Sequence, residues 1–226
     1  MGSTATNGSW LTALRGRFIV FDGPDGSGKS TQLRRLLDTA AEAGVPVCEV
    51  REPGGTEIGE RIRQILLDPL HTEMDVRCEL LLYMASRAQL VAQRIRPALA
   101  DGHLVLSDRY VSSTLAYQGT AGGIDPEEIL DVARTACGDP SSPSSAWPDL
   151  TVILDVSERT AARRLNPLLD RMEQKGVEFH RRVRQGFLAQ AERWPGRYTV
   201  VDASPDEPEI ESAVHTALRD RFAQSV

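Results

Sequence analysis

The sequence has few of the residues that build disulfide frameworks or metal clusters. Only three of its 226 residues are cysteine and four are histidine. Cys48, Cys78 and Cys137 are far apart and odd in number, and the histidines show no spacing typical of metal ligands. This pattern argues against a disulfide-stapled secreted scaffold, and it predicts a protein of the reducing cytoplasm.

Long apolar runs and an excess of positive charge are missing as well. No stretch approaches the roughly 20 apolar residues of a membrane-spanning helix, and residues 1–14 lack the pattern of a secretory signal. The chain carries 26 basic and 32 acidic side chains, a net charge of −6, so we expect neither nucleic acid nor a membrane as a partner. Residues 1–15 are expected to be a disordered lead-in, and residues 16–226 a single domain.

What the sequence does contain is an alternation of short apolar runs with longer amphipathic segments, typical of a parallel sheet wrapped by helices. The strand candidates are rich in β-branched residues and almost continuously apolar. Five strands are predicted, at residues 17–22, 45–51, 103–107, 150–156 and 197–202. Helices are predicted at residues 29–43, 57–68, 73–100, 125–137, 158–193 with an interruption, and 206–223. The predicted fold is a three-layer, doubly wound α/β domain with a five-stranded parallel sheet.

The first strand candidate leads into GPDGSGKS, which fits the pattern G-x-x-x-x-G-K-[ST] in full. The glycines let backbone N–H groups approach phosphate oxygens, and the amino end of the next helix adds partial positive charge. Lys29 can reach the β- and γ-phosphates, and the Ser30 hydroxyl is a ligand that Mg²⁺ accepts. We predict an ATP·Mg²⁺ site formed by Gly23, Pro24, Asp25, Gly26, Ser27, Gly28, Lys29, Ser30 and Thr31.

A phosphate-binding loop does not by itself distinguish a kinase from a switch GTPase or a motor. A GTPase needs the base-reading motif N-K-x-D, which the chain does not contain. Motors usually need a larger domain. The remaining class is a kinase that acts on a small molecule.

Three further motifs stand at the ends of other predicted elements. REPGGT (51–56) ends the second strand, DRY (108–110) ends the third and is followed by SSTLAYQG (112–119), and the long helix carries LLYMASR (81–87). Together with the phosphate loop, these motifs closely resemble the thymidylate kinases, which phosphorylate dTMP to dTDP with ATP and Mg²⁺ in dTTP synthesis. The resemblance spans about residues 17–202. It implies the fold of a P-loop nucleoside monophosphate kinase and a homodimer.

The resemblance also implies an acceptor site for dTMP. Tyr83 and Arg87 share a helix face at a spacing of four, where the ring would stack on thymine and the guanidinium would bind its exocyclic oxygen. Thr114 and Gln118 would also read the base. Tyr117 would close the ribose pocket where a 2′-hydroxyl would stand, which would explain a preference for deoxynucleotides.

Charged residues complete the site that the resemblance implies. Asp25 would hold the 3′-hydroxyl of dTMP, and Arg109 would bind its phosphate. Asp108 would lie near Mg²⁺, together with Ser30. Arg51 is expected beside the acceptor phosphate, next to a cis peptide bond before Pro53 in a tight turn.

The chain departs from the family pattern at the phosphate loop and in the lid. Some thymidylate kinases have a catalytic arginine in the loop where this chain has Gly26, so the cation is expected from a lid at about residues 159–173. Arg164 and Arg171 are the candidates, and both remain open. Pro167 should break the helix there and give a hinged segment.

The expected chemistry follows from charge. The acceptor phosphate is largely ionised at neutral pH, because its second pKa is about 6, so no general base is needed. Lys29, Arg109 and a lid arginine would neutralise two polyanions. One alternative is another nucleotide kinase or a deoxynucleoside kinase, whose neutral hydroxyl acceptor would need a base such as Glu52. A non-catalytic nucleotide sensor is a second alternative, disfavoured by the joint presence of Lys29, Ser30, Asp108 and Arg109.

Overall fold

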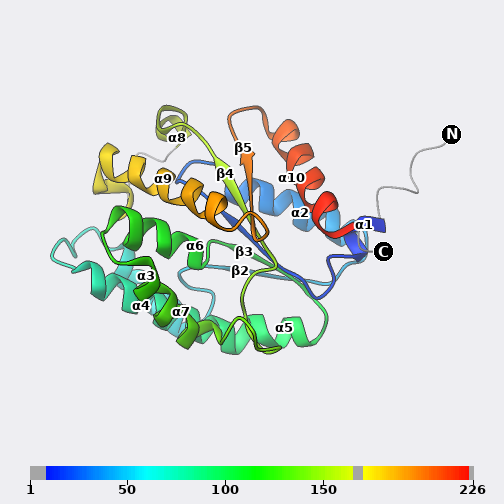
Figure 1. Ribbon diagram of the computed structural model, residues 1–226, viewed down its shortest axis with the longest axis horizontal. Coiled ribbons are helices and arrows are strands. Elements are labelled where there is room, and N and C mark those ends of the chain that lie inside the picture. The colour runs from blue at the N-terminus through cyan, green and yellow to red at the C-terminus, as the bar shows by residue number, and fades with distance from the viewer. Residues whose placement is uncertain (1–8, 165–169, 224–226) are drawn as a thin grey trace.

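The computed structural model describes residues 9–164 and 170–223, and its centre is one parallel sheet (Figure 1). The strands lie in the order β2-β3-β1-β4-β5, and every pairing is parallel. The bounds are β1 Phe18–Asp22, β2 Val47–Arg51, β3 Leu104–Asp108, β4 Leu150–Asp155 and β5 Tyr198–Asp202. The predicted five-stranded α/β fold is confirmed, with strand ends within two residues of those expected.

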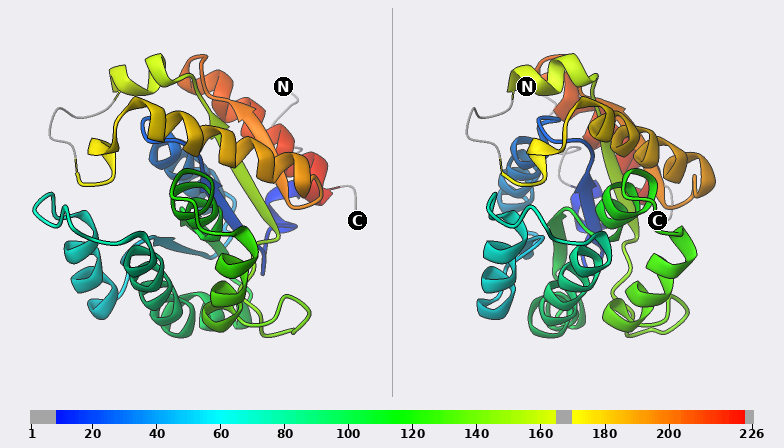
Figure 2. Two further views of the ribbon diagram at one scale, coloured as in Figure 1. Left: turned by 60° about the vertical axis from the view of Figure 1, so that its left-hand side comes forward. Right: turned by 90° about the vertical axis from the view of Figure 1, so that its left-hand side faces the viewer.

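Helices cover both faces of the sheet, which gives the three predicted layers (Figures 1 and 2). One face carries α1 Ser9–Thr12, α2 Lys29–Glu42 and α10 Glu207–Phe222. The other carries α4 Val76–Leu90 with its continuation η1 Val91–Ile95 and α5 Arg96–Ala100, then α6 Val111–Thr114, η2 Leu115–Ala121, α7 Pro126–Cys137 and α9 Val177–Arg193. The strands point alternate side chains to the two cores: Ile19 and Phe21 pack toward α2, whereas Phe18 and Val20 pack toward α4.

The amino-terminal segment differs from the expectation. From residue 9 the chain is helical and packed, with Trp10 5%, Leu11 2% and Leu14 0% exposed in the core beneath α10. The Trp10 and His215 rings lie 5.3 Å apart. The prediction of disorder through residue 15 is therefore wrong for residues 9–15, while residues 1–8 lie outside the described part.

The helices next to the functional loops agree only in part with the prediction. α3 Glu57–Leu67 begins at the predicted residue, and Thr56 caps it: its side-chain oxygen accepts a hydrogen bond from Gly59 N at 3.0 Å. α6 and η2, which follow β3, were not among the predicted helices. The expected interruption after β4 is confirmed, since α8 spans Glu158–Arg164 and the short helix η3 Glu173–Lys175 precedes α9.

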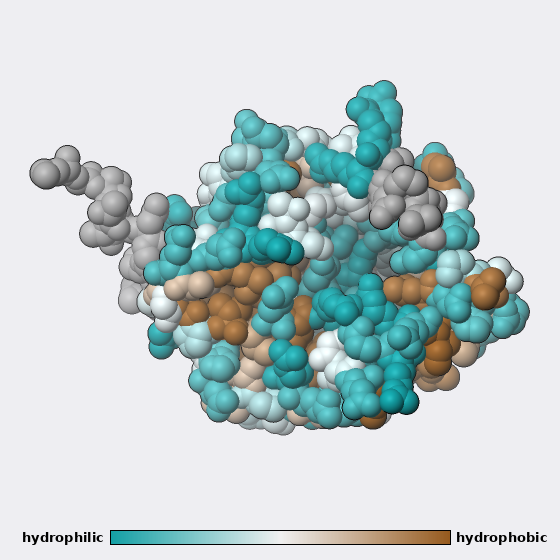
Figure 3. Space-filling view, turned by 180° about the vertical axis from the view of Figure 1, so that it is seen from behind, coloured by the Kyte–Doolittle hydropathy of each residue, from teal (hydrophilic) through white to brown (hydrophobic). Residues whose placement is uncertain are grey.

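Seen from behind, the surface is mostly hydrophilic with apolar patches between (Figure 3). Some large apolar side chains are exposed on neighbouring helices, among them Ile58 and Ile65 of α3 and Leu81 of α4. Within the described residues, no helix is both long and apolar enough to cross a bilayer.

Candidate active site

The phosphate loop joins β1 to α2, as its sequence pattern predicts. Gly26 has φ 75°, and a Cβ built there would lie 2.5 Å from the carbonyl oxygen of Ala161 in α8. Helix α8, in the predicted lid, thus packs against the position where some thymidylate kinases carry an arginine. A side chain at residue 26 would force α8 away from the loop.

Lys29 lies folded over this loop. Its Nζ donates to the Pro24 carbonyl at 2.8 Å and to the Gly23 carbonyl at 3.2 Å. Burial, followed by the nearby Arg109, lowers the pKa of Lys29 to about 8, against the opposing pull of Asp25. The amine is still cationic at neutral pH and stands where the loop would hold phosphates.

Ser30, in the first turn of α2, lies beside Asp108 at the end of β3. Ser30 Oγ donates to Asp108 Oδ2 at 2.7 Å. A hydroxyl and a carboxylate are hard oxygen ligands, and Mg²⁺ typically takes one or two of these and completes its shell with nucleotide phosphates and water. The two residues predicted as metal ligands therefore form a pair that fits Mg²⁺ bound to a nucleotide.

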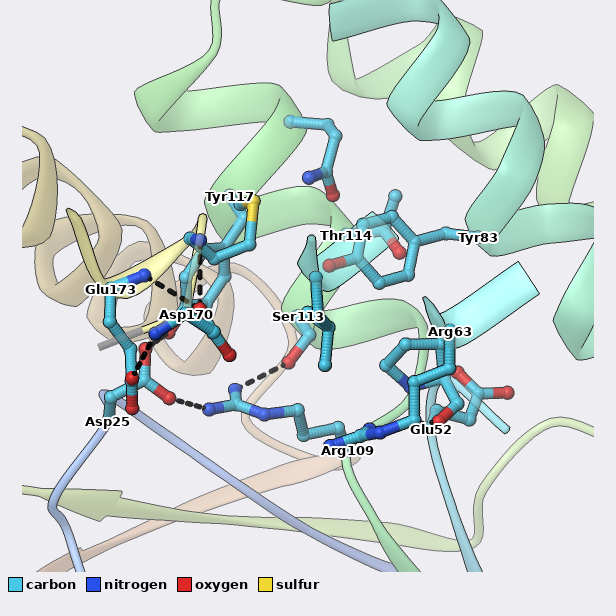
Figure 4. Close-up of a pocket in the computed structure, with 14 residues that line it drawn as sticks. Asp25, Glu52, Arg63, Tyr83, Arg109, Ser113, Thr114, Tyr117, Asp170 and Glu173 are labelled. Carbon is cyan, nitrogen blue, oxygen red and sulfur yellow. Dashed lines mark hydrogen bonds and ion pairs between the residues drawn. The ribbon is translucent and has the colours of Figure 1, made fainter. Parts of the chain in front are cut away.

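Two cavities meet at the carboxyl ends of β1 and β3. The phosphate cavity is bordered by the phosphate loop and includes Lys29, Ser30, Asp108 and Arg164. The second, which we call the acceptor cavity, lies under α4 and η2 and has fourteen lining residues (Figure 4): Asp25, Glu52, Pro53, Arg63, Leu67, Tyr83, Arg109, Ser113, Thr114, Tyr117, Gln118, Asp170, Met172 and Glu173. Asp25 and Arg109 line both cavities. A group bound in one cavity would therefore face a group bound in the other at this pair.

The shared wall is a charged cluster. Arg109 is the one non-glycine residue of the described chain with a left-handed backbone, φ 71°, and its guanidinium forms an ion pair with Asp25 (Figure 4). It also donates to Ser113 Oγ at 3.0 Å. Tyr117 Oη donates to Asp25 Oδ2 at 2.7 Å. Although burial raises the pKa of Asp25, Arg109 and Lys29 outweigh it, so the pKa lies below its ordinary value and the carboxylate is ionised.

A buried carboxylate that the sequence analysis did not single out supports this cluster. Asp22, at the end of β1, is fully buried and accepts hydrogen bonds from Ser112 Oγ at 2.5 Å, Ser113 Oγ at 2.7 Å and Gly23 N at 2.9 Å. These bonds fasten the start of the phosphate loop to α6. Arg109, between them, lies 3.5 Å from Asp22 Oδ1.

Arg87, expected to bind the base directly, lies behind the cavity wall. It is 1% exposed, and its Nε donates to both oxygens of Glu52, at 2.8 and 3.0 Å. Its two terminal nitrogens also donate to Thr114 Oγ1 at 3.2 Å. Tyr83 and Thr114, which were also predicted to contact the base, line the cavity. Burial raises the pKa of Glu52 to about 7, against the opposing effect of Arg87.

Arg51, expected beside the acceptor phosphate, is instead turned toward α3. Its Nη2 lies 2.9 Å from both oxygens of Glu60, and it does not line the cavity. Arg63 of α3, which was not predicted, does line the cavity and donates to the carbonyl of Pro53 at 3.0 Å. The peptide bond before Pro53 is cis, as expected. A helical arginine seven residues after the end of the motif gave no signal that separates it from a solvated surface charge.

The two arginines of the predicted lid lie at different ends of the site. Arg164 lines the phosphate cavity and donates to the carbonyl of Ala203 at 2.9 Å. Arg171 is 7% exposed, and it donates to the Leu66 carbonyl at 2.7 Å and to Glu79 Oε1 at 2.9 Å, on the acceptor side. This arrangement does not support the expectation that Arg171 meets the transferred phosphate. The hinge expected at Pro167 lies outside the described residues.

Comparisons with known proteins point to one family. Residues 21–214 match the family model described as thymidylate kinase. The chain is 48% identical over 197 residues to a thymidylate kinase of Pelotomaculum thermopropionicum, covering 86% of this chain and 88% of the relative. It is 44% identical to that of Deinococcus radiodurans, covering 92% and 98%. This chain belongs to the thymidylate kinase family.

The match to a solved structure supports the same assignment. The crystal structure of thymidylate kinase from Ehrlichia chaffeensis superposes with a TM-score of 0.71 at 31% identity, covering 90% of this chain and 98% of that one. As a member of this family, the chain is an ATP-dependent nucleoside monophosphate kinase. Its fold is that of the P-loop nucleoside monophosphate kinases.

Proposed function

We propose that the chain transfers the γ-phosphoryl group of ATP directly to the phosphate of dTMP. The observation that carries this proposal is the meeting of the two cavities at Asp25 and Arg109. ATP would occupy the cavity of the phosphate loop, and dTMP would occupy the cavity under α4. Arg109, shared by both, is the cation best placed to bring the two anions together.

Mg²⁺, which neutralises charge on the β- and γ-phosphates, would be held by Ser30 and Asp108. The chain itself supplies further cations. Lys29 would bind the outer phosphates of ATP, and Arg164 would meet the charge that develops on the transferred group. The acceptor phosphate needs no general base, since it is already an anion near neutral pH.

The cavity under α4 has the groups to recognise a thymine deoxynucleotide. The Tyr83 ring lines it as a flat apolar surface for a base. Thr114 Oγ1 accepts from Arg87, which leaves its own hydroxyl proton for an oxygen of the base. Tyr117 and Asp25 would border the sugar, with Asp25 accepting from the 3′-hydroxyl.

The deoxynucleoside kinase alternative assigns Glu52 as the base. In the structure both Glu52 oxygens accept from Arg87, and Glu52 is only 5% exposed. A carboxylate engaged in this way is poorly placed to take a proton from a sugar hydroxyl. The arrangement therefore favours a phosphate acceptor.

A homodimer in the cytoplasm is also proposed. The exposed Ile58, Ile65 and Leu81 on α3 and α4 offer an apolar surface that a second copy would bury. Sedimentation equilibrium that gives a monomer mass at micromolar concentration would exclude the dimer. Cys48, Cys78 and Cys137 are all unpaired, which is consistent with a reducing compartment.

A coupled ADP-release assay across a panel of acceptors tests the proposed function. dTMP should be used best, dUMP less well by the value of one methyl group, about 1–3 kcal/mol. Purine monophosphates should be poor acceptors, since the polar groups of the base site would be left unpaired. A higher kcat/KM for AMP, GMP or thymidine than for dTMP would refute the proposal.

A further inference from the structure

A buried carboxylate on α4 connects residues 171–175, here called the lid arm, to the acceptor cavity. Glu79 is 1% exposed. Its Oε1 accepts from Lys175 Nζ at 2.7 Å and from Arg171 Nη1 at 2.9 Å, both from the lid arm. Its Oε2 accepts from Gln118 Nε2 at 3.0 Å. Gln118 lines the cavity, so one carboxylate bridges the arm and a base-site residue.

The charge of Glu79 decides which way the Gln118 amide turns. Burial by itself would raise the pKa of Glu79, but hydrogen bonds from Lys175 and Arg171 lower it below its ordinary value. An ionised carboxylate only accepts hydrogen bonds. The amide must therefore present its NH₂ group to Glu79, which leaves Oε1 as the polar atom of Gln118 available to a ligand.

A fixed carbonyl oxygen distinguishes two kinds of pyrimidine. Thymine and uracil carry a hydrogen on ring nitrogen N3 and can donate to Gln118 Oε1. Cytosine has a bare N3 with a lone pair, which would face the same oxygen without a proton between them. A site built to accept a hydrogen bond rejects a ligand that cannot donate one, because the buried polar atoms stay unpaired.

We propose that Glu79 is a positioning residue that locks the Gln118 amide with its oxygen toward the acceptor base, and so sets selection for a base with an N3–H over one with a bare N3. The inference rests on the proposed dTMP site. It adds a residue that touches no substrate and acts through Gln118. Arg171 and Lys175 hold the carboxylate in place from the other side.

Steady-state kinetics of Glu79→Gln with dUMP and dCMP test this inference. The two acceptors differ only at the N3–C4 edge of the base, so neither the methyl group nor the sugar contributes. The wild-type protein should prefer dUMP by roughly 10²-fold or more in kcat/KM. In the variant the amide of residue 79 can donate to Gln118 Oε1, so the Gln118 amide can turn over. The dUMP/dCMP ratio should then fall by about tenfold or more.

Lys175→Met is the matched control, because Arg171 still pairs with Glu79 at 2.9 Å and keeps the carboxylate charged, so that Oε2 remains an acceptor for Gln118. Its ratio should stay within about twofold of wild type, even if its KM for dTMP rises. Circular dichroism and thermal unfolding report whether the variants fold. If Glu79→Gln does not fold, Glu79→Asp, which keeps the charge but draws back by one methylene, decides in its place with a lowered ratio.

The outcomes separate this inference from the proposed function. A folded Glu79 variant whose dUMP/dCMP ratio equals that of wild type overturns the role of Glu79, as does an equal fall in Lys175→Met. A wild-type protein that uses dCMP as well as dUMP would instead contradict the proposed thymine site, and with it the inference.

Discussion

At the residue scale, the buried amine of Lys29 makes a prediction about pH. Its pKa of about 8 means that it is a cation below that pH and neutral above it. kcat/KM for ATP, which reports on the free enzyme, should therefore fall as the pH rises through about 8. Lys29→Arg, which stays charged throughout, should not show this alkaline fall, even if its activity is lower. A wild-type profile that is flat up to pH 9.5 would contradict the assigned cause.

Site residues differ in how far the sequence could predict them. The residues of the phosphate loop and Asp108-Arg109 were predictable, because each motif is contiguous and follows a strand. Asp22, Arg63 and Glu79 were not. Asp22 and Glu79 take part through partners far along the chain, as Glu79 does with Arg171, 92 residues away. Local pattern carries no information on such pairs. Arg63 stands alone in a helix outside any motif.

At the scale of elements, the lid presents two arginines with different expected roles. Arg164→Ala should lower kcat by roughly 10²-fold, as the loss of one preorganised charge does elsewhere, with a smaller change in the KM for dTMP. Arg163→Ala is the control, since that side chain is exposed at the neighbouring position, and it should stay within a few-fold of wild type. Stopped-flow single-turnover rates would separate the chemical step from product release.

Equal rates for Arg164→Ala and wild type would move the missing cation elsewhere, with Arg63 the next candidate. It lines the acceptor cavity and already donates to the Pro53 carbonyl. Arg171→Ala should behave differently from Arg164→Ala. Glu79 keeps Lys175 as a partner at 2.7 Å, so the loss of stability should stay below the roughly 3–5 kcal/mol of an unpaired buried charge, and dTMP binding should weaken.

Helix α1 shows what a compositional argument misses. The first residues are small and polar, which favoured disorder, yet Trp10, Leu11 and Leu14 have a spacing that places them on one side of a turn. Trp10→Ala should lower the free energy of unfolding by about 3 kcal/mol, or roughly 6–12 °C in melting temperature for a chain of this size, with kcat unchanged. Leu70→Ala, 82% exposed, is the control and should change stability by less than about 0.5 kcal/mol.

At the scale of the whole molecule, the fold was predictable because its signals repeat. Apolar strand runs alternate with amphipathic helices along the chain, and the phosphate loop marks the first strand as central. The strand order could not be read from these runs, since each is equally apolar. The sequence predicted that the functional loops follow the carboxyl ends of the strands. Only the structure separates the two cavities and shows that Asp25 and Arg109 belong to both.

Two anions that meet at Arg109, one in each cavity, imply transfer of the γ-phosphoryl group from ATP to dTMP. Incubation with ATP labelled at the γ-phosphate, Mg²⁺ and dTMP, followed by separation of the nucleotides, tests this transfer. The label should appear in dTDP, and Lys29→Ala should reduce that product by 10²-fold or more while remaining folded. Label found only in inorganic phosphate would contradict this transfer. So would a higher yield of labelled product when thymidine replaces dTMP, because the label would then appear in dTMP.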